Sequence, residues 1–297
     1  MVDFMSKLKQ IHRDRVIGLP FQAYLSSPSL SASSLKLFID SPRKYQESIN
    51  GVKFKQTKAM TIGSAVHALI EGDEAFNAAY VVSPIKYDRR TLEGKRVYAE
   101  LQQDNPGMVI LNRNDYDDVV AMTESMLGIP EIRVWVDSID ADREVSWFWN
   151  SVNPNMRCRC RTDLEIPSEG VVLDYKTCGD SSPEGFMHSI GRFRYDLSAV
   201  HYLEGTGYSR YGWIAVQSRK PFTAYLHWMK PDHRIEQIKV LRKEAMERLL
   251  RFNQSNSPDV VDWSKDQGEL TSIPKEYWPA AEHKPWPYEG NVGQLTI

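Results

Sequence analysis

The chain has 297 residues, of which 41% are hydrophobic and 11% aromatic, and its formal net charge is −2 at pH 7. These proportions fit a globular protein that buries a full core. No apolar run approaches the roughly 20 residues that a membrane helix needs. Residues 1–15 also lack the apolar core of a signal peptide. We therefore expect a cytoplasmic protein without a membrane segment.

The first predicted helix follows an irregular stretch over residues 1–30, which Pro20 and Pro28 interrupt. Ser33 or Ser34 is placed to cap this helix. Its apolar side then comprises Leu35, Phe38 and Ile39, and Ser41-Pro42 marks its end.

A second predicted helix runs from Met60 to a stop at Gly72. Gly63, His67 and Glu71 are spaced four residues apart, so they share one face of this helix. Glycine permits a close approach of another backbone, and a histidine with a carboxylate one turn away could bind a metal ion. A single histidine on an apolar helix is more often a core or surface residue.

Residues 73–135 are predicted to be mainly helical, and Asn114 is placed to cap the clearest helix, which extends to Leu127. Its apolar stripe is typical of core packing and carries no predicted chemistry. Residues 143–149 then read as a strand that continues through the turn residues 153–155 into the next strand.

The most informative segment is a predicted hairpin that carries Asp163 and Asp174. The turn signal Pro167-Ser168-Glu169-Gly170 separates two apolar strands. A turn centred on Ser168 and Glu169 places Asp163 directly opposite Asp174. Opposed residues have Cβ atoms about 4.5–5.5 Å apart, and two like charges there destabilise the sheet unless they are compensated. A divalent cation would supply that compensation.

Lys176 belongs to the same predicted site. Strand alternation places its side chain on the face of Asp174 and directs Tyr175 to the opposite face. Two carboxylates suit Mg²⁺ or Mn²⁺, and an ammonium beside them can orient a metal-bound water or neutralise charge in a transition state. This set of groups is what metal-dependent hydrolysis of a phosphodiester requires.

The remaining chain predicts a helix over residues 186–208, a strand hairpin over 212–217 and 223–229, and an amphipathic helix over 234–252 with its Lys, Arg and Glu residues outward. After residue 252 the composition becomes rich in proline and tryptophan. We predict a single domain over residues 1–252 and a C-terminal extension over 253–297 that packs on the body or on a neighbouring subunit.

Basic residues occur in local clusters despite the acidic net charge, and local distribution is the stronger indicator of nucleic-acid binding. Each cluster could be solvated surface, or together they could line a channel for phosphates, with Tyr45, Phe54 and Tyr87 as stacking neighbours for bases. The clusters are Arg43-Lys44, Lys53 with Lys55 and Lys58, Arg89-Arg90 with Lys95-Arg96, and Arg157 through Arg161.

Three cysteines, Cys158, Cys160 and Cys178, are too few for a disulfide framework or a four-cysteine iron–sulfur cluster. A zinc site would need a histidine as the fourth ligand. Buried thiols are the simpler interpretation.

These segments together resemble the exonuclease VIII, or RecE-like, branch of the PD-(D/E)XK nuclease superfamily. The resemblance covers residues from about 30 to 230. Its elements, in chain order, are the opening segment from Ser31 to Tyr45, the Gly63-His67-Glu71 helix, Glu144, Arg161-x-Asp163, Asp174-x-Lys176-Thr177, and a helix carrying Tyr195 and Tyr202. It implies an α/β fold with a restriction-endonuclease-like core, a central mixed sheet flanked by helices.

The resemblance also assigns roles to residues. It implies that His67, Asp163, Asp174 and the backbone carbonyl of Tyr175 hold the metal ions, with Lys176 as the catalytic lysine. In the resulting mechanism Asp163, Asp174, Glu144 and Lys176 form the catalytic group. The cofactor is Mg²⁺, for which Mn²⁺ can substitute.

Substrate contacts are predicted for four further residues: Arg161, Tyr195, Ser198 and Tyr202. The last three share one helical face. Relatives carry glutamine three residues after the tyrosine that opens this helix, whereas this chain has Ser198, which offers one hydroxyl in place of an amide. The difference affects how a phosphate or a metal-bound water is positioned and leaves the predicted metal ligands unchanged.

The resemblance implies a 5′-to-3′ exodeoxyribonuclease that degrades linear double-stranded DNA to expose single strands for recombination. It further implies a phage or prophage origin, a homo-oligomeric ring in the host cytoplasm, and a single-strand annealing protein as partner. Two alternatives remain at this point. One is an endonuclease or single-strand nuclease on the same fold, and the other is a non-catalytic DNA-binding or regulatory protein derived from a nuclease.

Overall fold

A computed structural model describes residues 11–52, 55–152, 154–230, 233–254 and 290–291. Strands and helices alternate irregularly along the chain. The strands are β1 (Arg13–Val16), β2 (Tyr80–Val82), β3 (Val109–Leu111), β4 (Asp142–Val152), β5 (Asn155–Ile166), β6 (Val171–Cys178), β7 (Arg210–Gln217), β8 (Ala224–Trp228) and β9 (Gly290–Asn291). The helices are α2 (Phe21–Ser26), α3 (Ala32–Asp40), α4 (Pro42–Ile49), α5 (Lys58–Glu71), α6 (Asp73–Ala79), α7 (Leu92–Asp104), α8 (Arg113–Leu127), α9 (Pro130–Val136), α10 (Pro183–Phe193), α11 (Tyr195–Thr206) and α12 (His233–Gln254).

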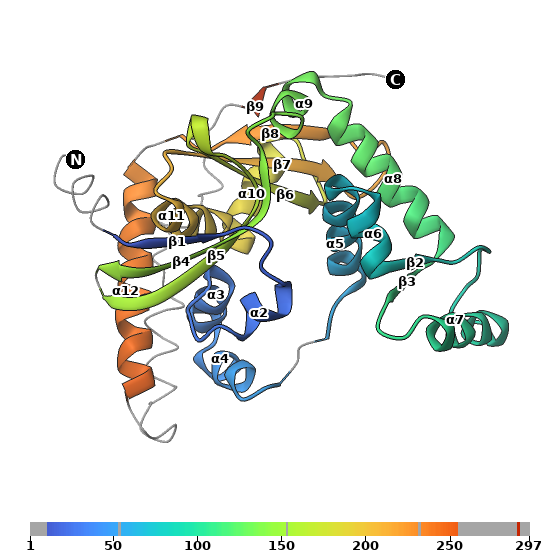
Figure 1. Cartoon of the computed structure of the whole chain (residues 1–297), viewed down its shortest axis with the longest axis horizontal. Helices are drawn as coiled ribbons and strands as arrows, with labels where there is room; N and C mark the ends of the chain where they lie inside the picture. The colour runs from blue at the N-terminus through green and yellow to red at the C-terminus, as the bar shows by residue number, and fades with distance from the viewer. Residues whose placement is uncertain (1–10, 53–54, 153, 231–232, 255–289, 292–297) are drawn as a thin grey trace.

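A seven-stranded sheet in the order β1-β4-β5-β6-β7-β8-β9 forms the centre of the molecule (Figure 1). Only β6 and β7 pair in parallel, and the other neighbours are antiparallel. Helices flank this mixed sheet. The predicted α/β fold with a central mixed sheet flanked by helices is confirmed.

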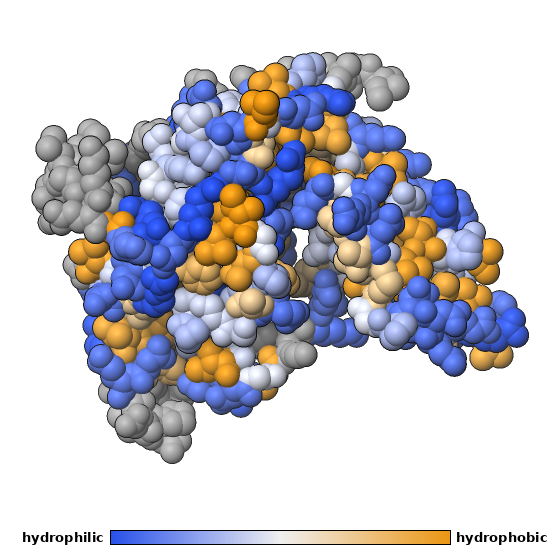
Figure 2. Space-filling model, in the orientation of Figure 1, coloured by the Kyte–Doolittle hydropathy of each residue, from blue (hydrophilic) through white to orange (hydrophobic). Residues whose placement is uncertain are grey.

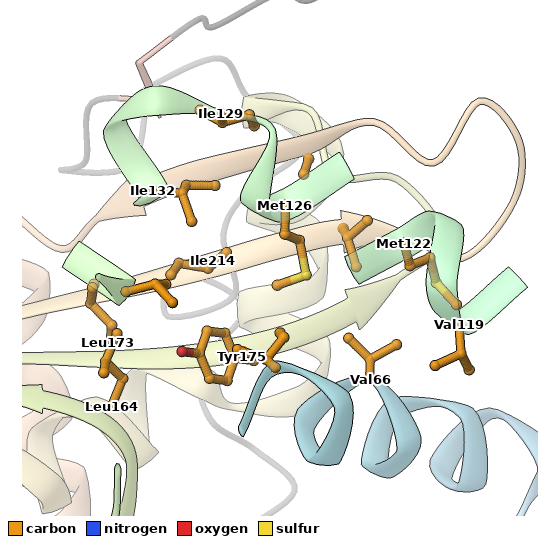
Figure 3. Packing of buried hydrophobic residues seen from close by; sticks show 14 of the residues in the cluster. Val66, Val119, Met122, Met126, Ile129, Ile132, Leu164, Leu173, Tyr175 and Ile214 are labelled. Carbon is orange, nitrogen blue, oxygen red and sulfur yellow. The ribbon is translucent and has the colours of Figure 1, made fainter. Parts of the chain in front are cut away.

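Helices cover both faces of the sheet with apolar side chains. On one face, Val66 of α5 and Val119, Met122 and Met126 of α8 pack with the ring of Tyr175 on β6 (Figure 3). On the other face, Phe186 and Ile190 of α10 and Ala199 of α11 pack against β6 and β7. A further cluster joins α3 and α12 to β4 and β5. The hairpin β5–β6 therefore lies in the most enclosed part of the molecule.

The N-terminal region is more regular than predicted. β1 pairs antiparallel with β4, with Arg13 opposite Trp149 at one end and Val16 opposite Ser146 at the other. Helix α2 follows β1 in the chain. The predicted irregular stretch was therefore wrong from residue 13, because pairing with β4 organises residues that have weak local preferences. The cap of α3 is Ser31, whose hydroxyl accepts a hydrogen bond from the Ser34 amide, and Ser41 caps α4 in the same manner.

Two further helix boundaries differ from the predictions. Asn112, not Asn114, caps α8 by accepting from the Asn114 amide. The single helix predicted over residues 186–208 is two helices, because Arg194 adopts a left-handed conformation with φ of 50° between α10 and α11. The short parallel pair of β2 and β3 was not predicted.

The long helix α12 was predicted correctly, but one residue of its predicted outer face is buried. Arg242 is 3% exposed and pairs with Glu204 through two contacts of 2.7 and 3.1 Å. Its Nε also donates to His201 Nδ1, while His201 Nε2 lies 3.1 Å from the Arg159 carbonyl. This network attaches α12 to α11 and to β5 through buried, satisfied polar groups.

All three cysteines are free and buried, as the simpler interpretation expected. The predicted C-terminal extension lies outside the described residues except for 253–254, which end α12, and for β9, which pairs with β8. In the described part of the chain, no helix combines the length and the apolar character that crossing a membrane requires.

Candidate metal and phosphodiester site

The hairpin β5–β6 has the predicted register. Leu164 pairs with Leu173 and Ile166 with Val171 across a short helical turn over Pro167–Glu169, and Gly170 closes that turn with φ of 60°. The regular ladder ends at Leu164, so Asp163 and Asp174 are the next opposed pair. Their carboxyl groups share a hydrogen bond, and the Tyr175 amide donates to Asp163 Oδ2 at 2.8 Å.

Lys176 lies on the face of Asp174, as strand alternation predicted. Its Nζ is 2.5 Å from Asp174 Oδ2 and donates to the Tyr175 carbonyl at 3.1 Å. The Tyr175 ring points the other way into the core beside Val66, where Figure 3 shows it between β6 and α5. Core packing of this ring fixes the backbone carbonyl that faces the site.

Helix α5 presents His67 to the same point. His67 Nε2 is 2.9 Å from the Tyr175 carbonyl oxygen, and Nδ1 is 3.5 Å from Asp163 Oδ2. Gly63, one turn earlier, permits this approach, because a Cβ there would lie 3.1 Å from Thr177 Oγ1 on β6. The predicted close approach at this glycine is therefore to a side-chain hydroxyl of β6 rather than to its backbone.

Glu144 reaches the site through an unusual backbone conformation. Its φ is 51°, a left-handed value that non-glycine residues rarely adopt. The β4–β5 ladder passes from Arg143–Leu164 to Val145–Thr162 without pairing Glu144 regularly. Such conformations cost about 1–3 kcal/mol and persist where surrounding packing determines them, often at functional sites. The distortion places a carboxylate beside Asp163 on the neighbouring strand.

Three potential ligand atoms from His67, Glu144 and Asp163 lie within 4.8 Å of one another. Asp174 was predicted as a ligand, but in the structure its carboxylate pairs with Lys176 next to this group. Glu144, predicted as a member of the catalytic group but not as a metal ligand, is one of these three residues. The Tyr175 carbonyl accepts from His67 and Lys176, and its role as a metal ligand stays a prediction.

The pKa values at the site are shifted because two carboxyl groups, Asp163 and Asp174, share one nearby ammonium, that of Lys176. Burial and the neighbouring Asp174 raise the pKa of Asp163 well above its usual value. Burial alone would raise the pKa of Asp174, but the Lys176 ammonium lowers it below its usual range. The two carboxylates in turn raise the pKa of Lys176 against the effect of burial, so Lys176 is a cation.

The donor set fits a divalent cation. Burial and Lys176 lower the pKa of His67 to about 4, so its ring is neutral at pH 7 and carries one N–H. Because the Tyr175 carbonyl can only accept, that hydrogen is on Nε2 and leaves Nδ1 as an acceptor facing Asp163. Two opposed acceptors need a proton or a cation between them. One imidazole and two carboxylates are ligands that Mg²⁺ and Mn²⁺ accept.

Glu71, one helical turn beyond His67, also reaches this point. Its carboxyl group is hydrogen-bonded to that of Glu144, and burial together with Glu144 raises its pKa to about 8. The four-residue spacing placed Glu71 on the face of His67, but nothing in the sequence indicated contact with Glu144, because that contact depends on the bend at β4.

All three arginines of the Arg157 to Arg161 cluster have partners within the protein, and Arg157 is exposed. Arg161 pairs with Glu144 and donates to the Leu19 carbonyl at 2.8 Å. Arg159 is buried over the ring of Tyr24, and Arg157 pairs with Asp14. The interpretation of this cluster as a phosphate channel is therefore wrong for Arg159, while the predicted substrate contact of Arg161 stays a prediction.

The aromatic residues proposed to stack on bases differ in exposure. Tyr45 is 8% exposed and packs on Phe38 and Phe252, so it is a core residue rather than a stacking platform. Tyr87 is half-buried, and Phe54 lies outside the described residues. Figure 2 shows the molecule hollowed between α2 and α5, with hydrophilic side chains along much of the border.

The face formed by Tyr195, Ser198 and Tyr202 adjoins the site. The Tyr195 ring centre is 5.3 Å from Lys176 Nζ, and Tyr202 packs edge-on against Tyr211. Ser198 Oγ accepts a hydrogen bond of 2.9 Å from Lys36 Nζ. No sequence pattern indicates Lys36 in this role, because Lys36 and Ser198 are 162 residues apart in the chain.

Residues 31–250 match the family described as a PDDEXK-like domain of unknown function (DUF3799). The chain belongs to this family. The match spans the three elements that build the site: the helix α5, the hairpin β5–β6 and the strand β4.

Two solved structures are similar in fold. The "Putative exonuclease" from Eubacterium rectale is 15% identical, with a TM-score of 0.57, and the alignment covers 84% of this chain and 93% of that one. A phage related exonuclease from Haemophilus somnus 129PT is 14% identical, with a TM-score of 0.31, over 78% of this chain and 98% of that one. Among curated proteins no match was found. The first similarity supports the restriction-endonuclease-like core.

Proposed function

We propose that this protein is a divalent-metal-dependent exodeoxyribonuclease that degrades linear double-stranded DNA from its 5′ ends. The observation that carries the proposal is the acidic pair Asp163 and Asp174, opposed on one hairpin, with Lys176 paired to Asp174 and His67 beside Asp163. Membership of a PDDEXK-like family and the fold similarity support the nuclease class.

His67, Glu144, Asp163 and Asp174 are the residues that would hold the cation. Mg²⁺ is the proposed ion, with Mn²⁺ able to substitute. When bound, such an ion polarises a phosphate and lowers the pKa of a bound water. The protein contributes a rigid frame, because the acids lie on three neighbouring strands and His67 is tied to the Tyr175 carbonyl.

Lys176 acts as a cation rather than as a base. Its pKa is raised by Asp174 and Asp163, so it keeps its proton at neutral pH. An ammonium held between Asp174 and the Tyr175 carbonyl can orient the attacking water and stabilise the charge that develops on the phosphate. Arg161, Tyr195, Ser198 and Tyr202 are the proposed neighbours of the substrate.

The finer assignments rest on the resemblance to the RecE-like branch. They are the 5′-to-3′ direction, the exposure of single strands for recombination, a homo-oligomeric ring, a single-strand annealing partner and a phage or prophage origin with action in the host cytoplasm. They extend the proposal beyond the nuclease class.

The test is digestion of linear duplex DNA labelled separately at its 5′ and 3′ ends, with Mg²⁺ or with EDTA, alongside closed circular DNA. Lys176→Ala is the site variant. Lys243→Ala is the matched control, because Lys243 and its partner Glu247 both lie on α12, whereas Lys176 lies on β6.

Early loss of the 5′ label from linear DNA, absent with EDTA and with Lys176→Ala but retained with Lys243→Ala, is the expected result. Cleavage of the circle would replace the exonuclease by an endonuclease. No cleavage of any DNA with Mg²⁺ or Mn²⁺ would refute the nuclease and leave a DNA-binding or regulatory protein.

A further inference from the structure

A second lysine lies beside the proposed site. Lys36, on α3, is half-buried, and its Nζ donates to Ser198 Oγ at 2.9 Å and to the Phe193 carbonyl at 3.2 Å. The Tyr195 ring centre is 5.8 Å from Lys36 Nζ and 5.3 Å from Lys176 Nζ. Two ammonium groups from distant parts of the chain therefore approach one aromatic ring.

No carboxylate lies within 4.0 Å of Lys36 Nζ among the residues that the structure describes. The acids around it already have other partners. Asp174 pairs with Lys176 at 2.5 Å, Asp40 pairs with Arg194 at 3.2 Å, and Asp196 accepts from the Leu197 amide at 2.7 Å. Burial and the nearby Lys176 consequently lower the pKa of Lys36 to about 8.

An ammonium has three N–H donors, and Lys36 uses two of them on Ser198 and Phe193. A half-buried cation without an acid partner is unfavourable unless an anion compensates its charge. Ser198 and the Phe193 carbonyl hold the ammonium in place, so the third donor is preorganised. The ligand that this arrangement suits is an oxyanion that approaches from the side of Tyr195 and Lys176.

We propose that Lys36 binds a phosphate of the DNA strand that is cut, next to the phosphate that meets Lys176. This inference rests on the proposed nuclease function and adds a substrate-binding residue to it. Lys36 contributes affinity and placement of the strand, whereas Lys176 contributes to the chemical step.

The experiment measures equilibrium binding of a linear duplex by fluorescence anisotropy in the Lys176→Ala background, with Mg²⁺, across a series of salt concentrations. Lys36→Met is the test variant, Lys36→Arg keeps the charge, and Lys243→Met is the control with the same loss of charge on α12. We expect Lys36→Met to weaken binding about 3–10-fold and to reduce the salt dependence by about one phosphate contact. Lys36→Arg should keep most of the affinity, and Lys243→Met should match the parent.

Thermal unfolding accompanies the binding measurement. The melting temperature of Lys36→Met should not fall, because the substitution removes a half-buried cation that lacks an acid partner. Equal affinity and equal salt dependence for Lys36→Met and the parent would refute the role of Lys36 while leaving the nuclease intact. Failure of the parent to bind DNA, together with failure of the wild type to cleave it, would instead overturn the proposed function and this inference with it.

Discussion

Asp163 and Glu165 lie two residues apart on β5, and their surroundings are opposite in kind. Glu165 is fully buried and accepts from Arg15 Nε, Trp147 Nε1 and Thr162 Oγ1, each at 2.8 Å. Asp163 accepts from one backbone amide and lies next to three further acceptors, namely Asp174, Glu144 and His67 Nδ1, with the Lys176 ammonium as the nearby cation.

The difference separates a structural acid from a candidate functional one. A buried carboxylate surrounded by donors is stabilised as an anion and anchors the strands that supply the donors. A half-buried carboxylate next to two other carboxylates and one ammonium carries excess negative charge, which destabilises the fold until a proton or a further cation arrives. Substitutions at Glu165 therefore serve as controls for substitutions at Asp163, and the reverse.

The largest expected effect is on catalysis. Asp163→Asn should reduce cleavage of linear duplex DNA by about 10²–10³-fold or more, because it removes a carboxylate that we propose holds the cation. Initial rates with Mg²⁺, per folded molecule, provide the measurement. Glu165→Gln should keep the rate per folded molecule, and a comparable loss in both variants would remove the distinction.

The second effect is on stability, and here the substitution at Glu165 should have a large effect and the substitution at Asp163 a small one. Glu165→Ala leaves Arg15, Trp147 and Thr162 without their common acceptor, and breaking a buried ion pair on one side costs about 3–5 kcal/mol. Denaturant unfolding should show this loss. Asp163→Asn without metal should unfold no more easily than the wild type, since it removes repulsion; a large loss there would contradict the comparison.

The increase in stability on metal binding should depend on Asp163 and not on Glu165. At a concentration 100 times its dissociation constant, a cation that binds only the folded state adds about 2.7 kcal/mol. We expect Mg²⁺ or Mn²⁺ to raise the melting temperature of the wild type and of Glu165→Gln, and to leave Asp163→Asn nearly unchanged. A shift retained in Asp163→Asn would place the cation elsewhere.

The smallest effect is a pH dependence at Glu71. Its pKa is raised from 4.5 to about 8, so the folded state binds this proton more tightly than the unfolded state between those values. The associated stability is present below pH 4.5 and is lost as the pH rises through about 8. Glu71→Gln should therefore match the wild type near pH 4.5 and exceed it at pH 8–9, by about 1 kcal/mol after allowance for solvent screening. Unfolding in EDTA at several pH values tests this sign, and a constant difference would contradict it.

Local pattern was a good guide where the decisive contacts are near in sequence. The hairpin register follows from one turn and two apolar strands, so the opposition of Asp163 and Asp174 and the side of Lys176 could be predicted. The face of α5 that carries His67 follows from helical spacing alone. Helix caps were less well predicted, since several serines or asparagines compete for each N-terminus and packing selects among them.

The hairpin, the alternation along β6 and the shared helical face of Gly63 and His67 can all be predicted from the sequence, because each depends on backbone geometry over a few residues. The position of Glu144 beside His67 and Asp163 depends instead on contacts between distant parts of the chain and on the left-handed backbone of Glu144 itself. Tertiary structure also brought Lys36 to Ser198 across 162 residues. The chemical difference between Asp163 and Glu165 has the same origin, because the donors that satisfy Glu165 come from β1 and β4, and no local pattern distinguishes two buried acids on one strand.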